Sequence, residues 1–371
     1  MLYDRRDFGL LRLAGTYQWL PAAPLKKLSA LKTLRREAEL LSTLGLVSYA
    51  RSGEYLMPSP QGYEFLSGID QTCQPPTKRP YAQSPALRRR LEVGTILLTC
   101  IGAGIEPAFG KVEHLKRQPV FFPAFALRNA GGNLMNAAGC AGFGHWGSTA
   151  YMTLYVSAQN TGFVMTNELG HLHNLASVFS ETLDTPQALI LAGESYQSVY
   201  EVLTKKTLSK RHGKKGFVDY SHAYLRMGIP VCLVSCDDTG VMQLAIMRQS
   251  DHRARIAKAA FGARWKPEDD QLPEADGHVD GKPLVIAVDM DLRRLERVCR
   301  DACQQGRHEV LVAALEGQMS GLLLDIFPRG APIRALRINA QVLSVAFGGA
   351  CTMGDPWPDE PLKVKGGLAH V

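Results

Sequence analysis

An acidic residue and a lysine stand one residue apart in Asp280-Gly281-Lys282, and Asp289 follows further along the chain. Carboxylates that hold Mg²⁺ close to a lysine can cleave phosphodiester bonds, because the metal polarises the phosphate and activates water. Asp-Gly-Lys, however, has the composition of a turn, and Asp289 and Asp291 suit the end of a strand and the cap of a helix. We therefore favour structural roles for these residues and keep a Mg²⁺-dependent nuclease as an alternative.

Histidine and cysteine residues give only weak indications of a metal site. Glu168, His171 and His173 stand close together in ELGHLHN, but their spacing is not that of a structural zinc site. Two cysteine pairs also occur, Cys232 with Cys236 and Cys299 with Cys303. No companion pair of ligands follows at a fixed spacing, so we interpret these cysteines as core thiols. We predict no metal and no cofactor, with Mg²⁺ needed only if the nuclease alternative holds.

The sequence lacks the signals of nucleotide hydrolysis and of acyl transfer. The glycine-rich stretch 139–147 is not followed by Gly-Lys-Ser/Thr, which a phosphate-binding loop requires. There is no Gly-x-Ser-x-Gly nucleophile elbow. We expect the wider glycine-rich segment, residues 130–148, to form a surface loop or an irregular turn.

Lysine and arginine gather in two stretches that are candidates for contact with DNA phosphates. The first group is Lys26, Lys27, Lys32, Arg35, Arg36 and Arg51. The second group is Lys205, Lys206, Lys210, Arg211, Lys214 and Lys215. The triplet Arg88–Arg90 extends this footprint or caps an exposed helical face. The alternative for each group is a solvent-exposed basic surface that makes no contact with DNA.

The first basic group belongs to a stretch with strong local signals. Apolar residues recur at three- and four-residue steps over 29–44, which predicts an amphipathic helix with Ser29 as its N-cap. Gly45 ends this helix, and short strands over 47–49 and 55–57 flank the turn Arg51-Ser52-Gly53. Ser59-Pro60 then opens another helix. A helix followed by a basic-tipped hairpin is the arrangement of a winged helix, with the helix in the major groove and Arg51 near phosphate or the minor groove.

The rest of the chain alternates strands with helices. Residues 188–203 and 282–306 each predict a strand leading into a helix, which indicates an α/β domain with a mixed sheet. We expect a hairpin over 228–247, turned at Asp237-Asp238-Thr239-Gly240. Ser84-Pro85 predicts the start of a helix after a proline-rich segment. We therefore divide the chain into a winged-helix domain (1–70), a linker (71–86) and an α/β domain (87–371).

Composition sets loose bounds on function. Lysine and arginine total 42 against 35 aspartate and glutamate residues, a formal charge of +7 that permits a polyanionic partner without requiring one. The hydrophobic share of 46% is ordinary for a globular protein with a real core. Eight cysteines and the start MLYDRRDFG, which is not a secretory signal, favour reduced thiols in the cytoplasm. No apolar run reaches the roughly 18 residues of a membrane-spanning helix, so we expect no membrane partner.

The stretch TLRREAELLSTLGLVSYARSGEYLMPSPQGYEFL resembles the winged helices of bacterial regulators. It combines an arginine-bearing helix, L-x-x-L-G-L-V, a basic ribbon, and a last helix that starts with proline and glycine. The order of winged helix, linker and α/β domain, with the run ALILAGESYQSVYEVL, is similar to the replication-relaxation family of plasmids and integrative elements. That resemblance implies DNA binding during replication or transfer. It also implies a C-terminal domain related to restriction-endonuclease-like folds, here degenerate, because no acid–acid–lysine trio aligns.

We accordingly predict an α/β protein (α+β overall) in which a winged helix-turn-helix precedes a mixed-sheet domain. Its expected function is that of a non-catalytic, cytoplasmic DNA-binding accessory or regulator of a bacterial plasmid or mobile element, acting in replication, transfer or transcription control. Double-stranded DNA is the expected partner, with a homodimer and replication or transfer proteins as further partners. The alternatives are a Mg²⁺-dependent nuclease and an adaptor whose winged helix contacts protein.

Overall fold

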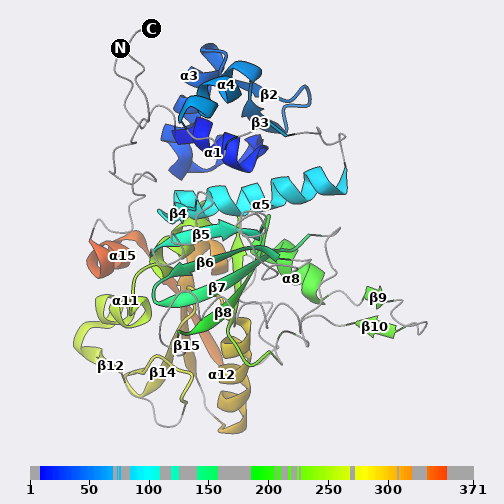
Figure 1. Ribbon diagram of the computed structural model, residues 1–371. Helices are drawn as coiled ribbons and strands as arrows, with labels where there is room; N and C mark the ends of the chain where they lie inside the picture. Colours follow the sequence, from blue (N-terminus) through cyan, green and yellow to red (C-terminus); the bar gives the residue numbers. More distant parts are fainter. Residues whose placement is uncertain are drawn as a thin grey trace.

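The computed structural model describes residues 9–69, 73, 75–76, 84–108, 118–124, 140–157, 185–204, 207–209, 216–218, 224, 227–267, 272–306, 309–319 and 332–348. Over these residues the chain is a mixed α/β protein, as the alternation of strands and helices predicted. Figure 1 shows the N-terminal helices and hairpin (blue) on one side of the long helix α5 (cyan) and a large sheet on its other side. No helix in this described part combines the length and the apolar character needed to cross a bilayer.

The N-terminal part consists of short helices around a small antiparallel sheet. Its elements are α1 (Gly9–Tyr17), β1 (Leu20–Pro21), α2 (Ala22–Lys27), the 3₁₀ turn η2 (Ser29–Leu31), α3 (Lys32–Thr43), β2 (Val47–Tyr49), β3 (Tyr55–Pro58) and α4 (Pro60–Ile69). The strand order is β1-β3-β2. The expected hairpin and the helix opened by Pro60 are therefore present, and Ser59 Oγ accepts a hydrogen bond from the Gly62 backbone N–H at 3.0 Å. Gly45 follows α3 with φ of +71°, a conformation that suits glycine.

Helix α3 packs on α1 through its apolar face. Leu34, Ala38 and Leu41 are buried, as the periodicity predicted. Glu37 is buried beside them, and its carboxylate accepts a hydrogen bond from the Leu10 backbone N–H at 2.7 Å. A carboxylate near the first turn of α1 is favourable because that turn has unpaired N–H groups and a positive helix-dipole end.

The prediction that Ser29 caps the following helix is wrong. Helix α3 begins after Leu31, which makes no side-chain cap hydrogen bond. Ser29 instead donates its backbone N–H and its hydroxyl to the carboxylate of Asp238, at 2.8 and 2.6 Å. The Ser29 side chain therefore bonds to a residue far away in the sequence and caps no helix.

Helix α5 (Pro85–Gly102) begins at Ser84, whose hydroxyl accepts from the Leu87 N–H at 3.2 Å. It covers one face of a six-stranded sheet of order β11-β8-β7-β6-β5-β4. The strands of this sheet are β4 (Glu106–Pro107), β5 (Val120–Pro123), β6 (Cys140–Trp146), β7 (Thr149–Tyr155), β8 (Gln187–Gly193) and β11 (Val231–Ser235). Strands β5, β6 and β7 form an antiparallel meander, and β8 and β11 continue parallel to β7.

A second sheet has the order β12-β13-β14-β15-β16. Its strands are β12 (Trp265–Lys266), β13 (His278–Val279), β14 (Lys282–Ile286), β15 (Val310–Leu315) and β16 (Ile333–Ile338), with the last three parallel. The helices associated with this part are α11 (His252–Phe261), α12 (Leu292–Gln304), the single turn α13 (Glu316–Gln318) and α15 (Ala340–Phe347). The two sheets meet where Cys232 of β11 forms an isolated bridge with Asp291. The predicted passage from strand to helix over 188–203 is also present, since α8 (Tyr196–Thr204) follows β8.

Two sequence-based expectations are wrong in this region. Residues 228–247 do not form a hairpin, because β11 is followed by the helix α10 (Asp238–Met247). Asp237 is the N-cap of that helix and accepts from the Gly240 N–H at 3.0 Å, so the aspartate that suggested a turn starts a helix. The glycine-rich segment 130–148 is not a loop over its last part, since 140–146 is strand β6; residues 130–139 lie outside the described chain.

Glycine occurs inside β6 because aromatic rings lie directly over the backbone. A Cβ at Gly144 would come within 1.9 Å of the Trp146 ring, and one at Gly142 within 2.4 Å of the Phe121 ring. The glycines therefore make room for large side chains, which is a packing role that composition alone does not distinguish from a loop.

The N-terminal elements and the six-stranded sheet share one buried core through α5. A single cluster of buried residues runs from Leu10 in α1, through Leu97 in α5, to Ile190 in β8 and Leu244 in α10. The described residues of the expected linker include Cys73, which is buried and packs against Gly15 of α1. The N-terminal part is thus held against the rest of the molecule by apolar packing.

We expect Gly94→Ala in α5 to lower the free energy of unfolding by about 1–3 kcal/mol, the usual cost of overpacking. A Cβ at Gly94 would lie 2.6 Å from Cδ of Pro21 in β1, and neither the ring nor the strand can move away easily. Gly68→Ala in α4 is the matched control. A Cβ there meets no atom within 4 Å, so this change should stabilise the helix by up to about 1 kcal/mol. Urea unfolding of both variants gives the comparison, and equal stabilisation would contradict the close packing.

Candidate nucleic-acid interface and a pocket between the sheets

The first basic group lies on the surface of the N-terminal part. Lys26 and Lys27 are exposed at the C-terminal end of α2, and Lys32 and Arg36 are exposed on α3. Arg51 is exposed in the turn between β2 and β3. The structure therefore places five of the six predicted phosphate contacts on solvent-facing positions of three adjoining elements (Figure 1).

Tyr49 of β2 connects these elements. The Lys26 ammonium lies 5.9 Å from the centre of the Tyr49 ring, a cation–π distance. Tyr49 is 40% exposed, and partial burial together with the nearby Glu39 of α3 raises the pKa of its hydroxyl. The end of α2, the outer face of α3 and the hairpin therefore converge around this aromatic ring.

Arg35 differs from the other members of the first basic group. Its guanidinium donates from Nε to the Leu25 carbonyl at 2.8 Å and from an Nη to the Leu28 carbonyl at 3.2 Å. These are carbonyls at the C-terminal end of α2 and just beyond it, where a helix has unpaired acceptors. Arg35 thus joins α3 to the end of α2, and its charge is already engaged within the protein.

The second basic group lies outside the described residues, namely Lys205, Lys206, Lys210, Arg211, Lys214 and Lys215. Of the neighbouring segments, β9 (Thr207–Ser209) lies between Lys206 and Lys210, β10 (Gly216–Val218) follows Lys215, and the two strands pair antiparallel. In the Arg88–Arg90 triplet, Arg88 is exposed on α5 and Arg90 lies over the Trp19 ring, 5.8 Å from its centre. Glu168, His171 and His173 also lie outside the described residues.

The structure does not bring the nuclease candidates together. Asp280 and Gly281 form the tight turn between β13 and β14, with φ of +51° and +75°. Asp280 pairs with Arg264, and Lys282 pairs with the half-buried Glu309, on the starting side of β14. Asp289 is buried beyond the other end of β14. Among the described residues, no group of three or more histidine, cysteine, aspartate or glutamate side chains is arranged to hold a metal ion.

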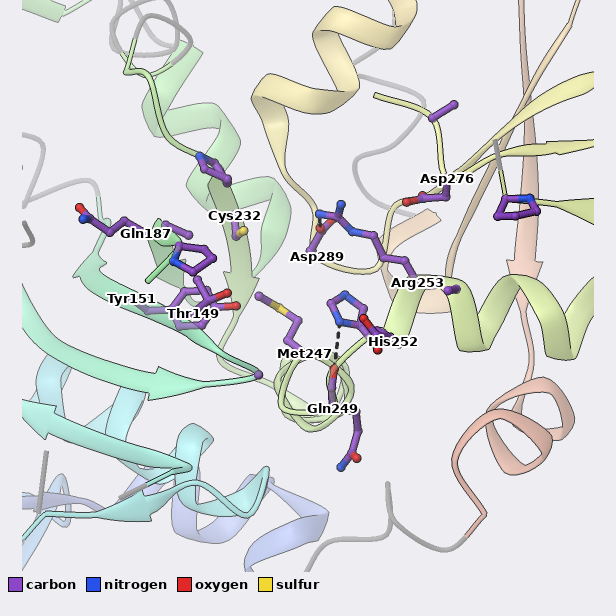
Figure 2. A pocket seen from close by; sticks show the side chains of 18 of the residues that line it. Thr149, Tyr151, Gln187, Cys232, Met247, Gln249, His252, Arg253, Asp276 and Asp289 are labelled. Atoms are coloured by element: carbon purple, nitrogen blue, oxygen red, sulfur yellow. Dashed lines mark hydrogen bonds and ion pairs between the residues drawn. The ribbon is translucent and has the colours of Figure 1, made fainter. Parts of the chain in front are cut away.

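Asp289 lies in the wall of a pocket of about 540 Å³ that is open to solvent. The starts of β7, β8 and β11 form one side through Thr149, Gln187 and Cys232, and the corner between α10 and α11 forms another (Figure 2). Trp265, Asp276 and Asp289 come from the second sheet and its loops. The pocket therefore lies where the two sheets meet, which is a common position for ligand sites between structural units.

Two ion pairs stabilise the pocket wall. Arg253 pairs with Asp289, and Arg294 pairs with Asp276 while also donating to the Ile286 carbonyl at 3.1 Å. Burial raises the pKa of Asp289, but the attraction of Arg253 and then of Arg294 outweighs it and holds that pKa below its usual value. Burial and the neighbouring Asp289 raise the pKa of Asp291.

Cys232 and His252 are uncharged in this environment. Burial, followed by repulsion from Asp289 and Asp291, raises the pKa of the Cys232 thiol well above its usual range, which agrees with a core thiol rather than a nucleophile. Burial lowers the pKa of the His252 imidazole. Its Nδ1 lies 3.2 Å from the Gln249 carbonyl, and its Nε2 is buried without a hydrogen-bond partner among the described residues.

Sequence reasoning missed this pocket almost entirely. It singled out Asp289 and Asp291 and assigned them to a strand end and a helix cap, and Asp291 does accept from the Arg293 and Arg294 N–H groups at 3.1 and 3.4 Å. His252 and Arg253 are consecutive residues of α11, and Asp276 comes from the segment before β13, so the three carry no recognisable motif spacing. The only local feature that could have drawn attention to this site is the short run Gln249–Arg253, which leads into α11.

Comparison of the chain with protein-family models, with curated proteins and with solved structures finds no match.

We expect Arg35→Ala to lower the free energy of unfolding by about 1–3 kcal/mol, because it removes charge-assisted hydrogen bonds to two carbonyls. Arg36→Ala, at the next position on the exposed face of α3, is the matched control and should change stability by less than about 0.5 kcal/mol. Denaturant unfolding monitored by circular dichroism distinguishes the two. Equal stability of both variants would show that Arg35 is not a structural residue.

Proposed function

We propose that this chain is a DNA-binding accessory or regulatory protein of a bacterial plasmid or mobile element, with an N-terminal winged helix as its DNA-binding part. The observation that carries the proposal is the set of exposed cations on α2, α3 and the hairpin tip: Lys26, Lys27, Lys32, Arg36 and Arg51. Their side chains lie on the outer surface of contiguous elements, where one duplex can meet several of them at once.

The order of the N-terminal elements supports a winged helix. Helices α2 and α3 follow each other closely, as in a helix-turn-helix, and α3 leads directly into the β2–β3 hairpin. Strand β1 lies beside β3 and completes a three-stranded sheet behind the helices. In this arrangement the exposed face of α3, with Lys32 and Arg36, enters the major groove, and Arg51 at the hairpin tip reaches the phosphates or the minor groove.

The larger part of the chain supports a restriction-endonuclease-like fold that has lost its catalytic set. A helix (α5) precedes an antiparallel meander (β5, β6, β7), and β8 then returns parallel to β7. Neither β6, with the sequence CAGFGHW, nor β7, with TAYMTLY, contains an acidic residue or a lysine. A scaffold of this kind holds the winged helix in place and offers surfaces to a second copy or to replication and transfer proteins.

We expect the double variant Lys32→Ala/Arg36→Ala to bind a mixed-sequence duplex at least about tenfold more weakly than the unaltered chain at low salt. Removing two phosphate contacts should also reduce the slope of log K against log salt by about 2. The matched control is Lys258→Ala/Arg300→Ala, which removes two exposed cations of α11 and α12 and should bind as the unaltered chain does. Fluorescence anisotropy over a salt series measures both quantities.

Equal weakening by the two double variants would attribute binding to net charge rather than to α3. An unaltered chain that binds no duplex at low salt would overturn the proposed function and leave the protein-binding adaptor as its replacement.

For the nuclease alternative we expect no Mg²⁺- or Mn²⁺-dependent nicking of supercoiled plasmid, because Asp280 and Lys282 are separated from Asp289 by the length of β14. Agarose-gel assays with the chain, with Asp280→Ala and with EDTA make the test. Metal-dependent nicking that Asp280→Ala abolishes would show that the chain is an enzyme and that Asp280 takes part in catalysis.

A further inference from the structure

Helix α12 carries two thiols on one face near its C-terminal end. Cys299 and Cys303 are four residues apart, so their side chains are neighbours on the helix surface. Cys299 is buried and Cys303 is exposed. Burial raises the pKa of the Cys299 thiol to about 11, and so do the charge of Cys303 and a hydrogen bond with its side chain. The two sulfur atoms are therefore in contact, and solvent reaches the pair through Cys303.

The exposure of Cys303 corrects one sequence-based interpretation. Reading this pair as core thiols is right for Cys299 and wrong for Cys303. The other cysteines that the structure describes are half-buried in the case of Cys236 and buried in the remaining cases. Within the described chain, the pair on α12 is thus the one that a reagent in solution can approach through an exposed thiol.

Helical geometry disfavours a disulfide between these two cysteines. Residues four apart on a helix have Cβ atoms about 5–6 Å apart, whereas a disulfide holds its Cβ atoms about 3.5–4.5 Å apart. The end of α12 would have to unwind to close that bond. An ion between the sulfurs requires less movement, because bonds of about 2.3 Å to each thiolate allow the sulfurs to lie up to about 4.6 Å apart.

The surroundings of the pair limit the kind of ion that it can hold. No group of three or more histidine, cysteine, aspartate or glutamate side chains in the described chain is arranged around a common ion. A structural zinc ion needs four such ligands, so two thiols do not make a zinc site. Soft ions prefer sulfur to oxygen and nitrogen, and Cu(I) or an arsenic(III) centre with one organic group is satisfied by two thiolates.

We propose that Cys299 and Cys303 form a binding site for one soft, thiophilic ion, which the two thiolates hold at the end of α12. The exposed Cys303 meets the ion first, and Cys299 completes the chelate from the buried side. Figure 1 shows α12 (gold) far from α2 and α3, at the other end of the molecule. The site therefore does not depend on the proposed function.

Phenylarsine oxide is the first probe of the site. Two As–S bonds form, the As=O bond breaks, and the oxygen leaves as water with the two thiol protons, so no atom is oxidised or reduced. An adduct that survives an excess of 2-mercaptoethanol requires two protein thiols on one arsenic atom. We expect the full chain to form this adduct, which intact-mass spectrometry detects and a titration quantifies.

Three variants test whether the pair is the chelating site. Cys299→Ser and Cys303→Ser each remove one sulfur and should weaken binding at least about a hundredfold, because the second thiol acts at a high effective concentration. Cys303→Ser/Gln304→Cys is the matched control for the number of thiols. It moves the exposed thiol to the next exposed position, about 100° around the helix, and should bind as weakly as Cys303→Ser. Circular dichroism shows whether each variant is folded.

Cu(I), added as its bicinchoninate complex, is the second probe and distinguishes a metal ion from a metalloid as the ligand. Binding of either probe that requires both cysteines supports the site. Failure of both probes to bind the unaltered chain would overturn it. Equal binding by the unaltered chain and by the folded Cys303→Ser/Gln304→Cys variant would overturn it as well, because the spacing of the thiols would then not matter.

Discussion

Burial of α5 on nearly all sides is the constraint on which the arrangement depends. From Val93 to Gly102 almost every residue of this helix is buried, and a helix that is apolar all round must be covered on more than one face. The six-stranded sheet covers one side, and α2, β1 and η2 cover the other. Two glycines, Gly94 and Gly102, allow the backbones to approach closely, with Pro21 and Ala30 as the neighbours. The N-terminal part is therefore fixed in orientation, and so is the exposed basic face of α3.

Helix α10 adds a second, polar constraint. Gln243 in its middle donates to the carbonyls of Leu233 and Asp289, at 2.8 and 3.1 Å, and accepts from the Tyr196 hydroxyl at 2.6 Å. Gln318 joins the same buried network through the Val288 carbonyl at 2.7 Å. A buried network whose donors and acceptors are all paired fixes relative positions more strictly than apolar contact does. Helix α10 therefore fixes the position of the second sheet relative to the six-stranded sheet. The same helix lines the pocket between the two sheets through Met247, and its first residue, Asp238, accepts two hydrogen bonds from Ser29.

Two features of the proposed DNA-binding surface follow from this framework. Arg35 donates hydrogen bonds to carbonyls at the end of α2, which fixes α2 relative to α3. Lys26 and Lys27, at the same end of α2, are exposed to solvent. The outer face of α3 changes from charged to apolar along the helix, with Lys32 and Arg36 in its first half, the exposed Leu40 in its second half, and the exposed Leu44 just after its end. In the proposed function, the charged first half of α3 is the part that faces a duplex, together with Arg51 of the hairpin.

Much of the local structure was determined by the sequence alone. The three- and four-residue spacing of Leu34, Ala38 and Leu41 predicted the helix and its buried face, and Gly45 and Ser59-Pro60 predicted where helices end and begin. These signals are local, since they depend on periodicity, on glycine conformation and on side-chain caps within a few residues. The exposed positions of Lys26, Lys27, Lys32, Arg36 and Arg51 followed from the same patterns.

Tertiary structure decided what depends on partners distant in the chain. Ser29 suggested a cap but donates to Asp238. Asp237 suggested a turn but is the N-cap of α10, which packs against β11. The glycines of β6 suggested a loop but lie beneath aromatic rings. Asp280, Lys282 and Asp289 stood close in sequence, yet Asp280 and Lys282 lie at the start of β14 and Asp289 beyond its end. The pocket, in contrast, brings His252 and Arg253 of α11 together with Asp276 from a distant segment. Spacing along the chain predicts contacts only within one element, and the pocket is built between elements.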